Sequence, residues 1–383
     1  MIPHSKNITC ISLMSGTSMD GIDAVVVDFN LDKRSATPAF RILGHHHINF
    51  DRHYQDKAQN VIEHQSLIHA YELGHILAQH YVNAVHTTLE KLRLTAQNIE
   101  FCAVSGHTLF HRPPTDKGNG MTIDTTDLSM LAALTDITTI GKFRQKDIAF
   151  GGQGAPLVPF AHPFIFGKDH PNALIQNMGG MGNLTLLEHG HPVAGWDTGP
   201  GNTWIDQAMQ WHTNGMQRFD EDGQTAARGK ADLNLLDQLL DHAFFRQPPP
   251  KSTGLQTIGL PHIGLFRSHI LALSKEDALA TVTHATAKTI SNAYEQWILP
   301  NHHPNKIILC GGGAKNKTLI RELKTLCAPL EVISSQKIGI DPCVVEALSF
   351  AFLGLYRYLE KPNTLAHITG AFKDSIGGEM AIA

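Results

Sequence analysis

The amino-acid sequence predicts an α/β protein of two domains, and three observations lead to this prediction. Its 383 residues exceed the roughly 100–200 that one domain usually contains. Short apolar runs of strand type occur in both halves of the chain, and segments of helical periodicity follow them. In each half, a loop rich in Gly, Ser, Thr and Asp stands at a junction between strands. This suggests a duplicated architecture, although no fixed-period repeat is visible.

The first domain is expected to span residues 1–145. An apolar run and an alternating run, separated by a glycine-containing turn, predict a β-hairpin near the start of the chain. A third, outer strand and a long segment with the apolar spacing of a helix follow, before the chain returns to a strand. The expected strands are 8–14, 22–29, 41–50 and 99–105, and the expected helix is 65–94.

The second domain is expected to span residues 146–367, and residues 368–383 are expected to pack back on the first domain. A loop dense in glycine and proline, 150–159, is typical of neither strand nor helix. Strands joined by tight turns follow it, and helices come after them, as in the first half. The expected strands are 172–178, 183–187, 193–196 and 306–310, and the expected helices are 203–245, 276–298, 318–326 and 344–359.

The composition excludes several classes of partner. A net charge of -4 and a pI near 6.7 give no electrostatic basis for binding nucleic acid or an anionic membrane. The sequence shows neither a secretory signal nor the roughly 18-residue apolar run of a membrane span, so a cytoplasmic protein is expected. Its five cysteines form no CxxC pair, which favours free thiols in a reducing compartment. The run His45–His47 lies on an outer strand, where neighbours point to alternate faces, so surface histidines are favoured over a metal site.

Three glycine-rich loops, at residues 15–21, 197–202 and 311–316, are the main chemical signal. Glycine lets backbone approach a ligand closely, and consecutive N–H groups bind phosphate oxygens. Ser15, Thr17 and Ser18 add hydroxyl donors to the first loop. No Walker, Rossmann or protein-kinase motif is present. A single such loop would be interpreted as an ordinary turn, but three at strand ends favour a nucleotide site.

Six segments together resemble the family of anhydro-N-acetylmuramic acid kinases. They occur in order along nearly the whole chain. These segments are Met14–Asp23, Gly151–Pro159, Asn177–Asn183, Trp196–Asn202, Pro249–Gly254 and Cys310–Asn316. The resemblance implies two RNase H-like domains of the actin/hexokinase type with a nucleotide cleft between them. It also implies ATP as phosphate donor, a role in peptidoglycan recycling and a homodimer, with no partner other than ATP and a small sugar.

The resemblance also assigns roles by position. It implies that Asp197 is the catalytic base, that Glu346 and Arg144 contact the sugar, and that His107 replaces a glutamine there. It implies a phosphate-binding loop from Gly16 to Asp23, in which Asp20 or Asp23 would hold Mg²⁺. The residues expected at the nucleotide are Gly16, Thr17, Ser18, Met19, Asp20, Gly21, Ile22, Asp23, Thr198, Gly199, Gly201, Asn202, Gly311, Gly312 and Gly313.

The chemistry of the implied substrate predicts a mechanism. The 6-oxygen of an anhydro sugar is tied to the anomeric carbon, so water must attack that carbon while the 6-oxygen leaves and captures a phosphoryl group. A carboxylate base opposite the leaving group suits this reaction, as in inverting glycosidases. The alternative interpretation is structural. Asp197 would cap a turn, and Glu346 would be a carboxylate at the start of a helix, where the helix dipole favours a negative charge. Ser105, His107 and Lys142 depart from the family's usual pattern, which affects sugar contacts more than phosphate contacts.

Two other classes of function stay open from the sequence. One is a different enzyme on the same fold, such as a kinase for another sugar or an exopolyphosphatase-like hydrolase. The other is a non-catalytic nucleotide-binding module. Segments 196–202 and 249–254 favour the anhydro-sugar kinase over a different enzyme on the same fold.

Overall fold

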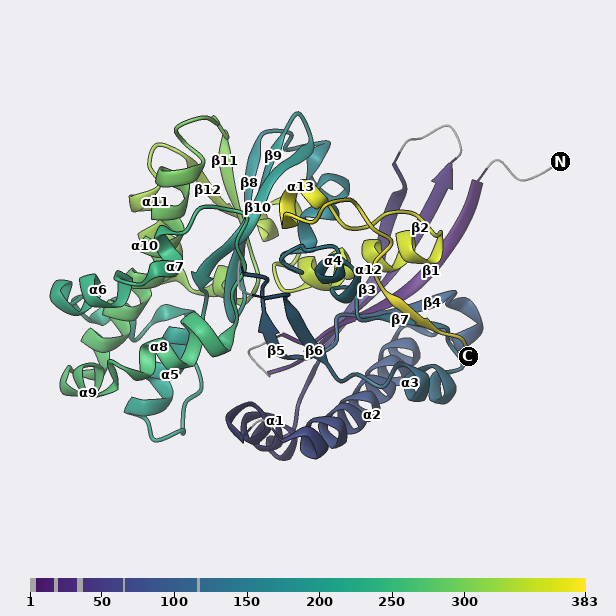
Figure 1. The fold of residues 1–383 in the computed structure, drawn as a ribbon, viewed down its shortest axis with the longest axis horizontal. Coiled ribbons are helices and arrows are strands. Elements are labelled where there is room, and N and C mark those ends of the chain that lie inside the picture. Colours follow the sequence, from purple (N-terminus) through teal and green to yellow (C-terminus); the bar gives the residue numbers. More distant parts are fainter. Residues whose placement is uncertain (1–4, 17–19, 33–36, 65, 116–117) are drawn as a thin grey trace. The chain divides into compact units, whose positions relative to one another are not determined.

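A computed structural model describes residues 5–16, 20–32, 37–64, 66–115 and 118–383 (Figure 1). The chain divides into two compact units. The first comprises Met1–Ile165 and Cys343–Ala383, and the second comprises Phe166–Pro342. Each unit has its own sheet and its own hydrophobic core.

The sheet of the first unit has the strand order β13-β7-β4-β1-β2-β3. Strands β1, β2 and β3 form an antiparallel meander, whereas β4 lies parallel to β1 and β7 parallel to β4. The strands are β1 (Ser5–Met14), β2 (Gly21–Asp32), β3 (Ala39–Asn49), β4 (Phe101–Val104), β7 (Thr139–Gly141) and β13 (Glu379–Ala381). A separate hairpin joins β5 (Thr108–Arg112) to β6 (Met121–Asp124).

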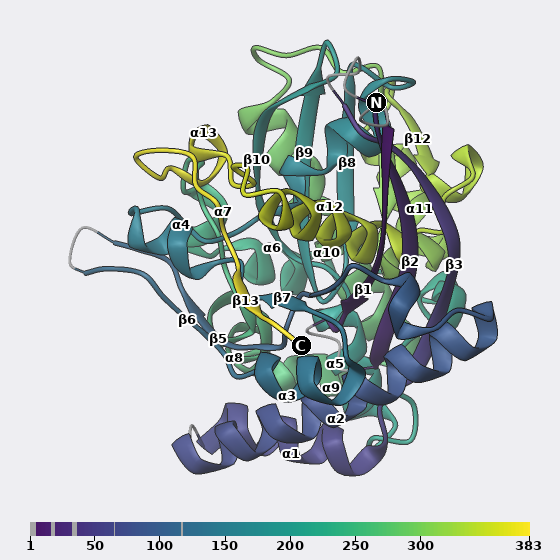
Figure 2. The same cartoon turned by 90° about the vertical axis from the view of Figure 1, so that its right-hand side faces the viewer.

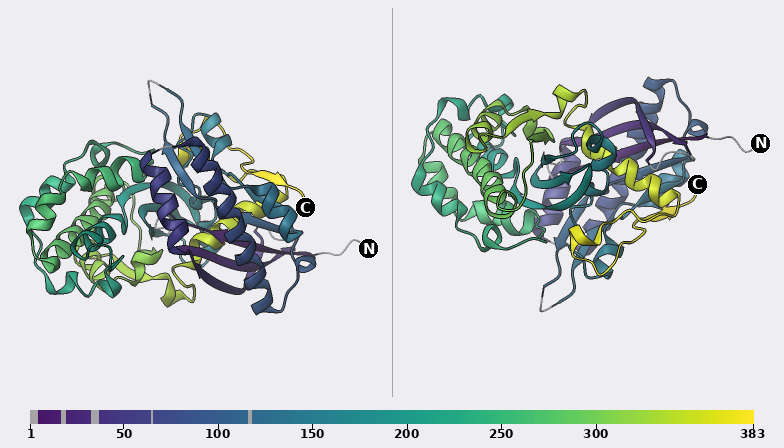
Figure 3. Two further views of the ribbon diagram at one scale, coloured as in Figure 1. Left: turned by 90° about the horizontal axis from the view of Figure 1, so that it is seen from below. Right: turned by 90° about the horizontal axis from the view of Figure 1, so that it is seen from above.

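Helices cover this sheet because its central strands are apolar on both faces. Helix α12 (Val344–Tyr358) packs against β1, β2 and β4, and α2 (Leu67–Leu92) contacts β1, β2 and β3. Figure 2 shows α12 lying along the sheet, and Figure 3 shows α1 (Arg52–His64) beside α2. The remaining helices of this unit are α3 (Leu128–Thr135), α4 (Gln145–Ala149) and α13 (Ala366–Thr369).

The second unit has a five-stranded sheet of order β10-β9-β8-β11-β12. Its core joins apolar side chains of the sheet to those of α5 and α10. The strands are β8 (Ala173–Met178), β9 (Met181–Glu188), β10 (His191–Pro200), β11 (Lys306–Cys310) and β12 (Glu331–Ser334). The helices are α5 (Thr203–His212), α6 (Leu233–Leu240), α7 (Ala243–Arg246), α8 (Leu260–Gly264), α9 (Arg267–Ala272), α10 (Lys275–Trp297) and α11 (Lys317–Leu326).

The two sheets share one topology. In each, the first three strands form an antiparallel meander, and the next two strands of the sheet add in parallel on the other side of the first. The order 3-2-1-4-5, with the second strand antiparallel, is that of the RNase H-like fold. The predicted fold class of two RNase H-like domains is therefore confirmed, and the suspected duplication is visible as repeated topology.

The division of the chain differs from the expected one. Residues 146–165 and 343–367 were assigned to the second domain, but they belong to the first unit. The reason is the apolar helix α12, whose side chains share a core with strands of the first sheet. The C-terminal residues do pack on the first unit, since β13 pairs with β7. The expected helical region 203–245 is divided into α5, α6 and α7.

The His45–His47 run lies at a sheet edge, and the cysteines are unpaired. His45–His47 lie on the edge strand β3, as expected, and no group of three or more His, Cys, Asp or Glu side chains gathers as a metal site in the described part of the chain. All five cysteines are free thiols, and Cys10 and Cys310 are fully buried in strands. None of the described helices is long and apolar enough to cross a membrane.

Candidate active site

Three strands of the second unit end at one edge of its sheet. Strands β8, β10 and β11 run in the same direction, and Asn177 at the end of β8 is paired with Cys310 of β11 and with Asn183 of β9. The loops that follow these strands therefore meet at the edge where open α/β sheets bind their ligands.

Hydrogen bonds hold these loops together. The amide of Gly201 donates to the carbonyl of Gly180 (2.9 Å), and the amide of Asn202 donates to that of Gly179 (2.8 Å). The side-chain amide of Asn202 also donates to the carbonyl of Met178 (3.2 Å). Segments 197–202 and 311–313 lie together, since Cβ atoms at Gly312 and Gly313 would lie 3.6 Å and 3.1 Å from the Asn202 side chain. The role of these segments at a nucleotide stays a prediction.

Several of the expected phosphate-binding glycines have a packing reason of their own. A Cβ atom at Gly201 would lie 2.1 Å from the carbonyl oxygen of Gly179, and one at Gly313 would lie 2.7 Å from the Met178 Cβ. Gly311 (φ +77°) and Gly199 (φ +127°) have backbone angles that side chains disfavour.

Gly312 is different. It is exposed, and, its chain neighbours aside, a Cβ there would have no neighbour among the described residues closer than the side-chain Nδ2 of Asn202 at 3.6 Å. Neither packing nor a left-handed backbone requires glycine at this position, so close approach of a ligand explains it best.

Asp197 lies in β10 at an irregularity of the pairing with β9, and only 5% of its surface is exposed. Its Oδ2 accepts a hydrogen bond from the amide of Thr253 (2.8 Å), and its own amide donates to the carbonyl of Lys251 (3.2 Å). A segment distant in sequence therefore fixes this carboxylate from its side chain and from its backbone. The Thr253 hydroxyl oxygen is buried and has no hydrogen-bond partner among the described residues.

Thr198, expected at the nucleotide, is hydrogen-bonded to a side chain of the second unit. Its hydroxyl accepts a hydrogen bond from the amide of Gln176 (3.2 Å), whose carbonyl oxygen in turn accepts from the hydroxyl of Tyr294 (2.8 Å). All three side chains are buried. This network holds β8, β10 and α10 together next to Asp197.

The first unit presents a corresponding edge, where β1, β4 and β7 end. The Ser15 hydroxyl is hydrogen-bonded to the Tyr81 hydroxyl (2.7 Å), and the Ser15 amide donates to the Ser105 Oγ (3.1 Å). The Ser105 hydroxyl donates to the carbonyl of Gly106 (3.1 Å). The loops after β1 and β4 are thus joined. Gly16 continues the first loop, whereas the expected phosphate contacts Thr17, Ser18 and Met19 lie outside the described residues.

The end of the predicted phosphate-binding loop enters β2. A Cβ at Gly21 would lie 2.3 Å from the carbonyl oxygen of Ile48, so the neighbouring strand requires this glycine, and Ile22 is fully buried. Asp20 is exposed, and its Oδ1 accepts from the amide of Gly21 (3.1 Å). Asp23 is paired with His47, with 2.8 Å between Oδ1 and Nδ1, and this hydrogen bond raises the pKa of His47. Of the two carboxylates suggested for Mg²⁺, Asp23 therefore already has a partner within the sheet.

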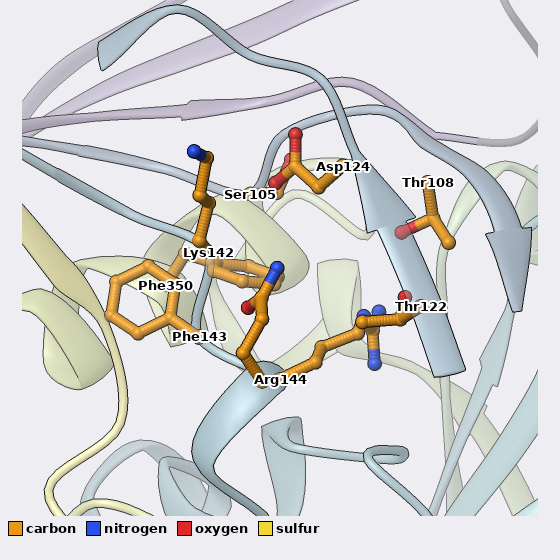
Figure 4. A pocket seen from close by; sticks show the side chains of 9 residues that line it. Ser105, Thr108, Thr122, Asp124, Lys142, Phe143, Arg144 and Phe350 are labelled. Atoms are coloured by element: carbon orange, nitrogen blue, oxygen red, sulfur yellow. The ribbon is translucent and has the colours of Figure 1, made fainter. Parts of the chain in front are cut away.

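A small pocket opens at the same edge of the first unit (Figure 4). Hydroxyls from the β5–β6 hairpin, two cations, one carboxylate and the rings of two phenylalanines surround it. The lining residues are Ser105, Thr108, Thr122, Asp124, Lys142, Phe143, Arg144, Gln145 and Phe350.

The charged groups of this pocket are held in defined positions. The Arg144 guanidinium donates to the carbonyl of Gly154 (2.8 Å), and Lys142 forms an ion pair with Glu379 (3.4 Å). Burial raises the pKa of Asp124, while hydrogen bonds from the amide and hydroxyl of Thr126 lower it. Hydroxyls with both cations and a carboxylate suit an acidic sugar derivative.

His107 lies in the loop between β4 and β5, between the pocket residues Ser105 and Thr108 in sequence, and is 2% exposed, with its ring centroid 6.3 Å from that of Tyr54. Neither of its ring nitrogens has a hydrogen-bond partner among the described residues, and burial lowers its pKa to about 4. A buried neutral imidazole with both nitrogens available can donate one hydrogen bond to a ligand and accept another.

Glu346 lies in the first turn of α12, one helical turn before the pocket residue Phe350. The glycine-rich loop 150–157 ends near the same helix and is anchored by the buried Asp147. That carboxylate accepts from the amide of Gly154 (2.8 Å) and the hydroxyl of Thr369 (2.7 Å). Burial raises the pKa of Asp147.

Two groups of the site were missed at the level of sequence. Asp124 ends the short alternating run 121–124, and this run is the one signal that could have found it. Lys251 belongs to a segment noted only for its resemblance, and nothing in its spacing indicates that it is buried beside Asp197.

Two RNase H-like units with glycine-rich loops and hydroxyls at the ends of their strands, and a buried aspartate in the second unit, are typical of nucleotide-dependent phosphotransferases. Comparison with known proteins gives the family. A model of the family described as anhydro-N-acetylmuramic acid kinase matches residues 8–382. The chain belongs to the anhydro-N-acetylmuramic acid kinase family and is an enzyme of the kinase type.

Individual relatives agree with this assignment. The anhydro-N-acetylmuramic acid kinase of Haemophilus influenzae is 36% identical over 373 residues, which cover 94% of each chain. That of Caldanaerobacter subterraneus subsp. tengcongensis is 32% identical over 383 residues, covering 97% of this chain and 96% of the relative. Solved structures resemble the chain distantly: component A of the (R)-2-hydroxyglutaryl-CoA dehydratase of Acidaminococcus fermentans has a TM-score of 0.47 and 11% identity, and the match covers 90% of this chain and 96% of that one.

Proposed function

We propose that this chain uses ATP to convert 1,6-anhydro-N-acetylmuramic acid and water into N-acetylmuramic acid 6-phosphate and ADP, in peptidoglycan recycling and amino sugar catabolism. Water attacks the anomeric carbon, the bond from that carbon to the 6-oxygen breaks, and the 6-oxygen takes the γ-phosphoryl group. The observation that carries the proposal is the buried Asp197, fixed beside glycine loops whose exposed member, Gly312, has no packing reason to be glycine.

The residues present fit ATP. Glycines 179–180 and 312–313 place backbone amides at the carboxyl edge of a sheet, where phosphates and ribose are commonly bound, whereas the amides of Gly201, Asn202 and Gly311 donate to carbonyls within the protein. When bound, ATP with Mg²⁺ would supply the phosphoryl group and neutralise its charge. Asp20 or Asp23 would hold the metal, directly or through water, and for Asp23 this would compete with its hydrogen bond to His47.

Asp197 would take a proton from the attacking water. Its Oδ2 accepts the Thr253 amide, which helps to orient the carboxylate. A positioned general base contributes about 10²–10⁴-fold to a rate. No separate acid is required if the leaving 6-oxygen is captured by the phosphoryl group as its negative charge develops.

In the first unit, Arg144 would pair with the lactyl carboxylate of the sugar, since a guanidinium binds carboxylates with two parallel hydrogen bonds. His107 would hydrogen-bond a neutral polar group, because its low pKa keeps it uncharged at neutral pH. Glu346 would accept hydrogen bonds from sugar hydroxyl or amide groups. Separate substitutions of Arg144, His107 and Glu346 would test these three roles one at a time.

The test is release of ADP from ATP with anhydro-N-acetylmuramic acid, compared with a panel of plain hexoses and with water alone. The anhydro sugar alone should support turnover. Turnover with plain hexoses would instead favour another sugar kinase, and ADP release without any sugar would favour a hydrolase. Asp197→Asn should lower kcat by about 10²–10⁴-fold and leave ATP affinity within twofold. Asp237→Asn, on the exposed side of α6, is the matched control and should behave like wild type.

The stereochemistry of the product gives a second check. Attack by water on the face opposite the leaving 6-oxygen inverts the anomeric carbon. The first anomer formed should therefore have the configuration opposite to that of the anhydro linkage, and NMR can detect it before the anomers equilibrate. Retention, or loss of less than tenfold in Asp197→Asn, would contradict the role proposed for this base.

We further propose that the enzyme acts in the cytoplasm as a homodimer, with ATP and the sugar as its small-molecule partners. The supporting argument is the family membership, since recycling of cell-wall fragments into metabolism requires cytoplasmic ATP. Light scattering coupled to size-exclusion chromatography should give twice the 42.0 kDa of one chain. A mass of one chain at micromolar concentration would contradict the dimer.

A further inference from the structure

Lys251 is buried to an extent that is unusual for a lysine. Only 3% of its surface is exposed, although lysine is rarely buried without an opposite charge. Its ammonium donates a hydrogen bond to the carbonyl of Phe244 (2.9 Å) and lies 4.6 Å from the centre of the Phe244 ring. A buried ammonium with this neighbourhood costs desolvation energy, so a compensating charge is expected close to it.

Burial lowers the pKa of Lys251, and the negative charge of Asp197 opposes this lowering. Asp197 is also the residue whose backbone amide donates to the Lys251 carbonyl (3.2 Å). The neighbour on the α7 side is a carbonyl and an aromatic ring, both uncharged. Because Coulombic attraction is reciprocal, the ammonium favours the ionised form of the carboxylate by the same amount.

The backbone around Lys251 holds the same carboxylate. The Lys251 carbonyl accepts the Asp197 amide (3.2 Å), and two residues later the Thr253 amide donates to Oδ2 (2.8 Å). The segment 251–253 therefore provides both the positive charge of Lys251 and two hydrogen bonds to Asp197. If the ammonium were only a packing element, a buried apolar side chain would serve with a smaller desolvation cost.

We propose that Lys251 is a positioning residue for Asp197, keeping the carboxylate ionised and oriented so that it can accept the proton of water. This inference rests on the proposed function, since it names the group that maintains the base. Lys251 itself does not touch the reacting atoms. Its loss should therefore lower kcat more than it changes the KM for either substrate.

Titration of Lys251 supplies a distinctive signature. Burial lowers the pKa of Lys251 to about 8, with the charge of Asp197 opposing this effect. Above that pH the ammonium loses its proton, and Asp197 loses the neighbouring positive charge. Activity should decline on the alkaline side for this reason, while protonation of Asp197 limits it on the acid side.

The experiment compares Lys251→Met, Lys251→Arg and wild type in the complete enzyme. The pH dependence of kcat/KM is measured between pH 5 and 10 with anhydro-N-acetylmuramic acid and ATP. Methionine keeps much of the stem but removes the charge, whereas arginine stays protonated throughout this range. Lys306→Met is the matched control, because Lys306 lies at the opposite end of β11 from the glycine loop and pairs with Glu331 (3.2 Å).

Lys251→Met should lower kcat at pH 7 by at least tenfold, shift the acid limb of the profile by about one pH unit upward and remove the alkaline limb near pH 8. Lys251→Arg should keep the acid limb of wild type and lose the alkaline one. Lys306→Met should match wild type in every respect.

An unshifted acid limb in Lys251→Met would overturn the inference, even if the variant is slower or less stable, because a packing role moves no pH profile. If Lys251→Met fails to fold, the arginine variant decides alone: a retained alkaline limb near pH 8 would refute the role. Absence of turnover by wild type would refute the proposed function, and an active wild type with unshifted variants would refute only the role of Lys251.

Discussion

Replacement of His107 by glutamine should make the first unit less sensitive to acid. His107 is 2% exposed, and neither ring nitrogen has a hydrogen-bond partner in the described part of the chain, so the substitution breaks no bond within the protein. Burial lowers its pKa to about 4 in the folded chain. In the unfolded chain the pKa returns to about 6.5.

The sign follows from proton binding. Between pH 6.5 and 4 the unfolded chain binds a proton at this residue and the folded chain does not, so the free energy of unfolding falls as the pH falls. The contribution of neutral His107 to the free energy of unfolding is therefore fully present above about pH 6.5 and is lost as the pH falls toward the folded-state pKa. For these two pKa values, the loss between pH 7.5 and pH 5 is about 2 kcal/mol.

The assay must report on the first unit. All four tryptophans lie between residues 196 and 297, so their fluorescence follows the second unit. Hydrogen exchange of peptides from β1 and β4 gives the opening free energy of the first unit at pH 7.5 and pH 5. His107→Gln should reduce the difference between the two pH values by about 2 kcal/mol.

His111 and His162 belong to the same unit, and burial lowers the pKa of each to about 3, so wild type retains further acid sensitivity that the variant shares. His69→Gln, on the exposed side of α2, is the control and should leave the difference unchanged. An equal pH dependence in wild type and His107→Gln would refute the reasoning, since it would mean that His107 has the same proton affinity folded and unfolded.

Two glycine substitutions separate ligand approach from packing. Gly312→Ala should preserve the melting temperature, because its Cβ would lie 3.6 Å from the side-chain Nδ2 of Asn202, an ordinary contact, and should weaken ATP binding at least tenfold in a calorimetric titration. Unchanged ATP affinity would remove Gly312 from the nucleotide site. Gly354→Ala should destabilise the first unit by about 1–3 kcal/mol, because its Cβ would lie 2.7 Å from the ring of Phe101. An unaltered melting temperature would show that α12 can shift. Gly264→Ala, with no atom within 4 Å, is the control for both.

Eight of the strands, among them the central strands of both sheets, were predictable from sequence because their patterns are physically simple. Strands β8 and β11 are buried along almost their whole length, and β11 appears in the sequence as an apolar run after Lys306, whereas β8 begins with the apolar residues Ala173, Leu174 and Ile175. The same holds for α12, whose apolar surface surrounds most of the helix because it is enclosed by a sheet and by residues 158–165. What its pattern could not reveal was the sheet against which it packs, and the domain boundary was misplaced for that reason.

Elements with a narrow buried surface were missed. Helix α1 buries Tyr54, Ala58 and Val61 among mostly polar neighbours, which is the correct helical spacing but too sparse to stand out. The β5–β6 hairpin has strands of five and four residues separated by a proline-containing connection. Its importance lies in carrying Thr108, Thr122 and Asp124 to the pocket, which no local pattern indicates.

The site shows where a sequence motif stops being informative. Glycine-rich strings drew attention to residues 197–202 and 311–313, but their letters do not distinguish glycines required by neighbouring backbone, such as Gly201, from one left open to a ligand, such as Gly312. That distinction needs the atoms of the adjacent loop. The same holds for Lys251, which by composition would be expected on the surface and is instead buried with Asp197. Burying an ammonium group costs free energy because the charge loses its hydration. The position of Lys251 beside the proposed base is therefore better explained by catalysis than by stability.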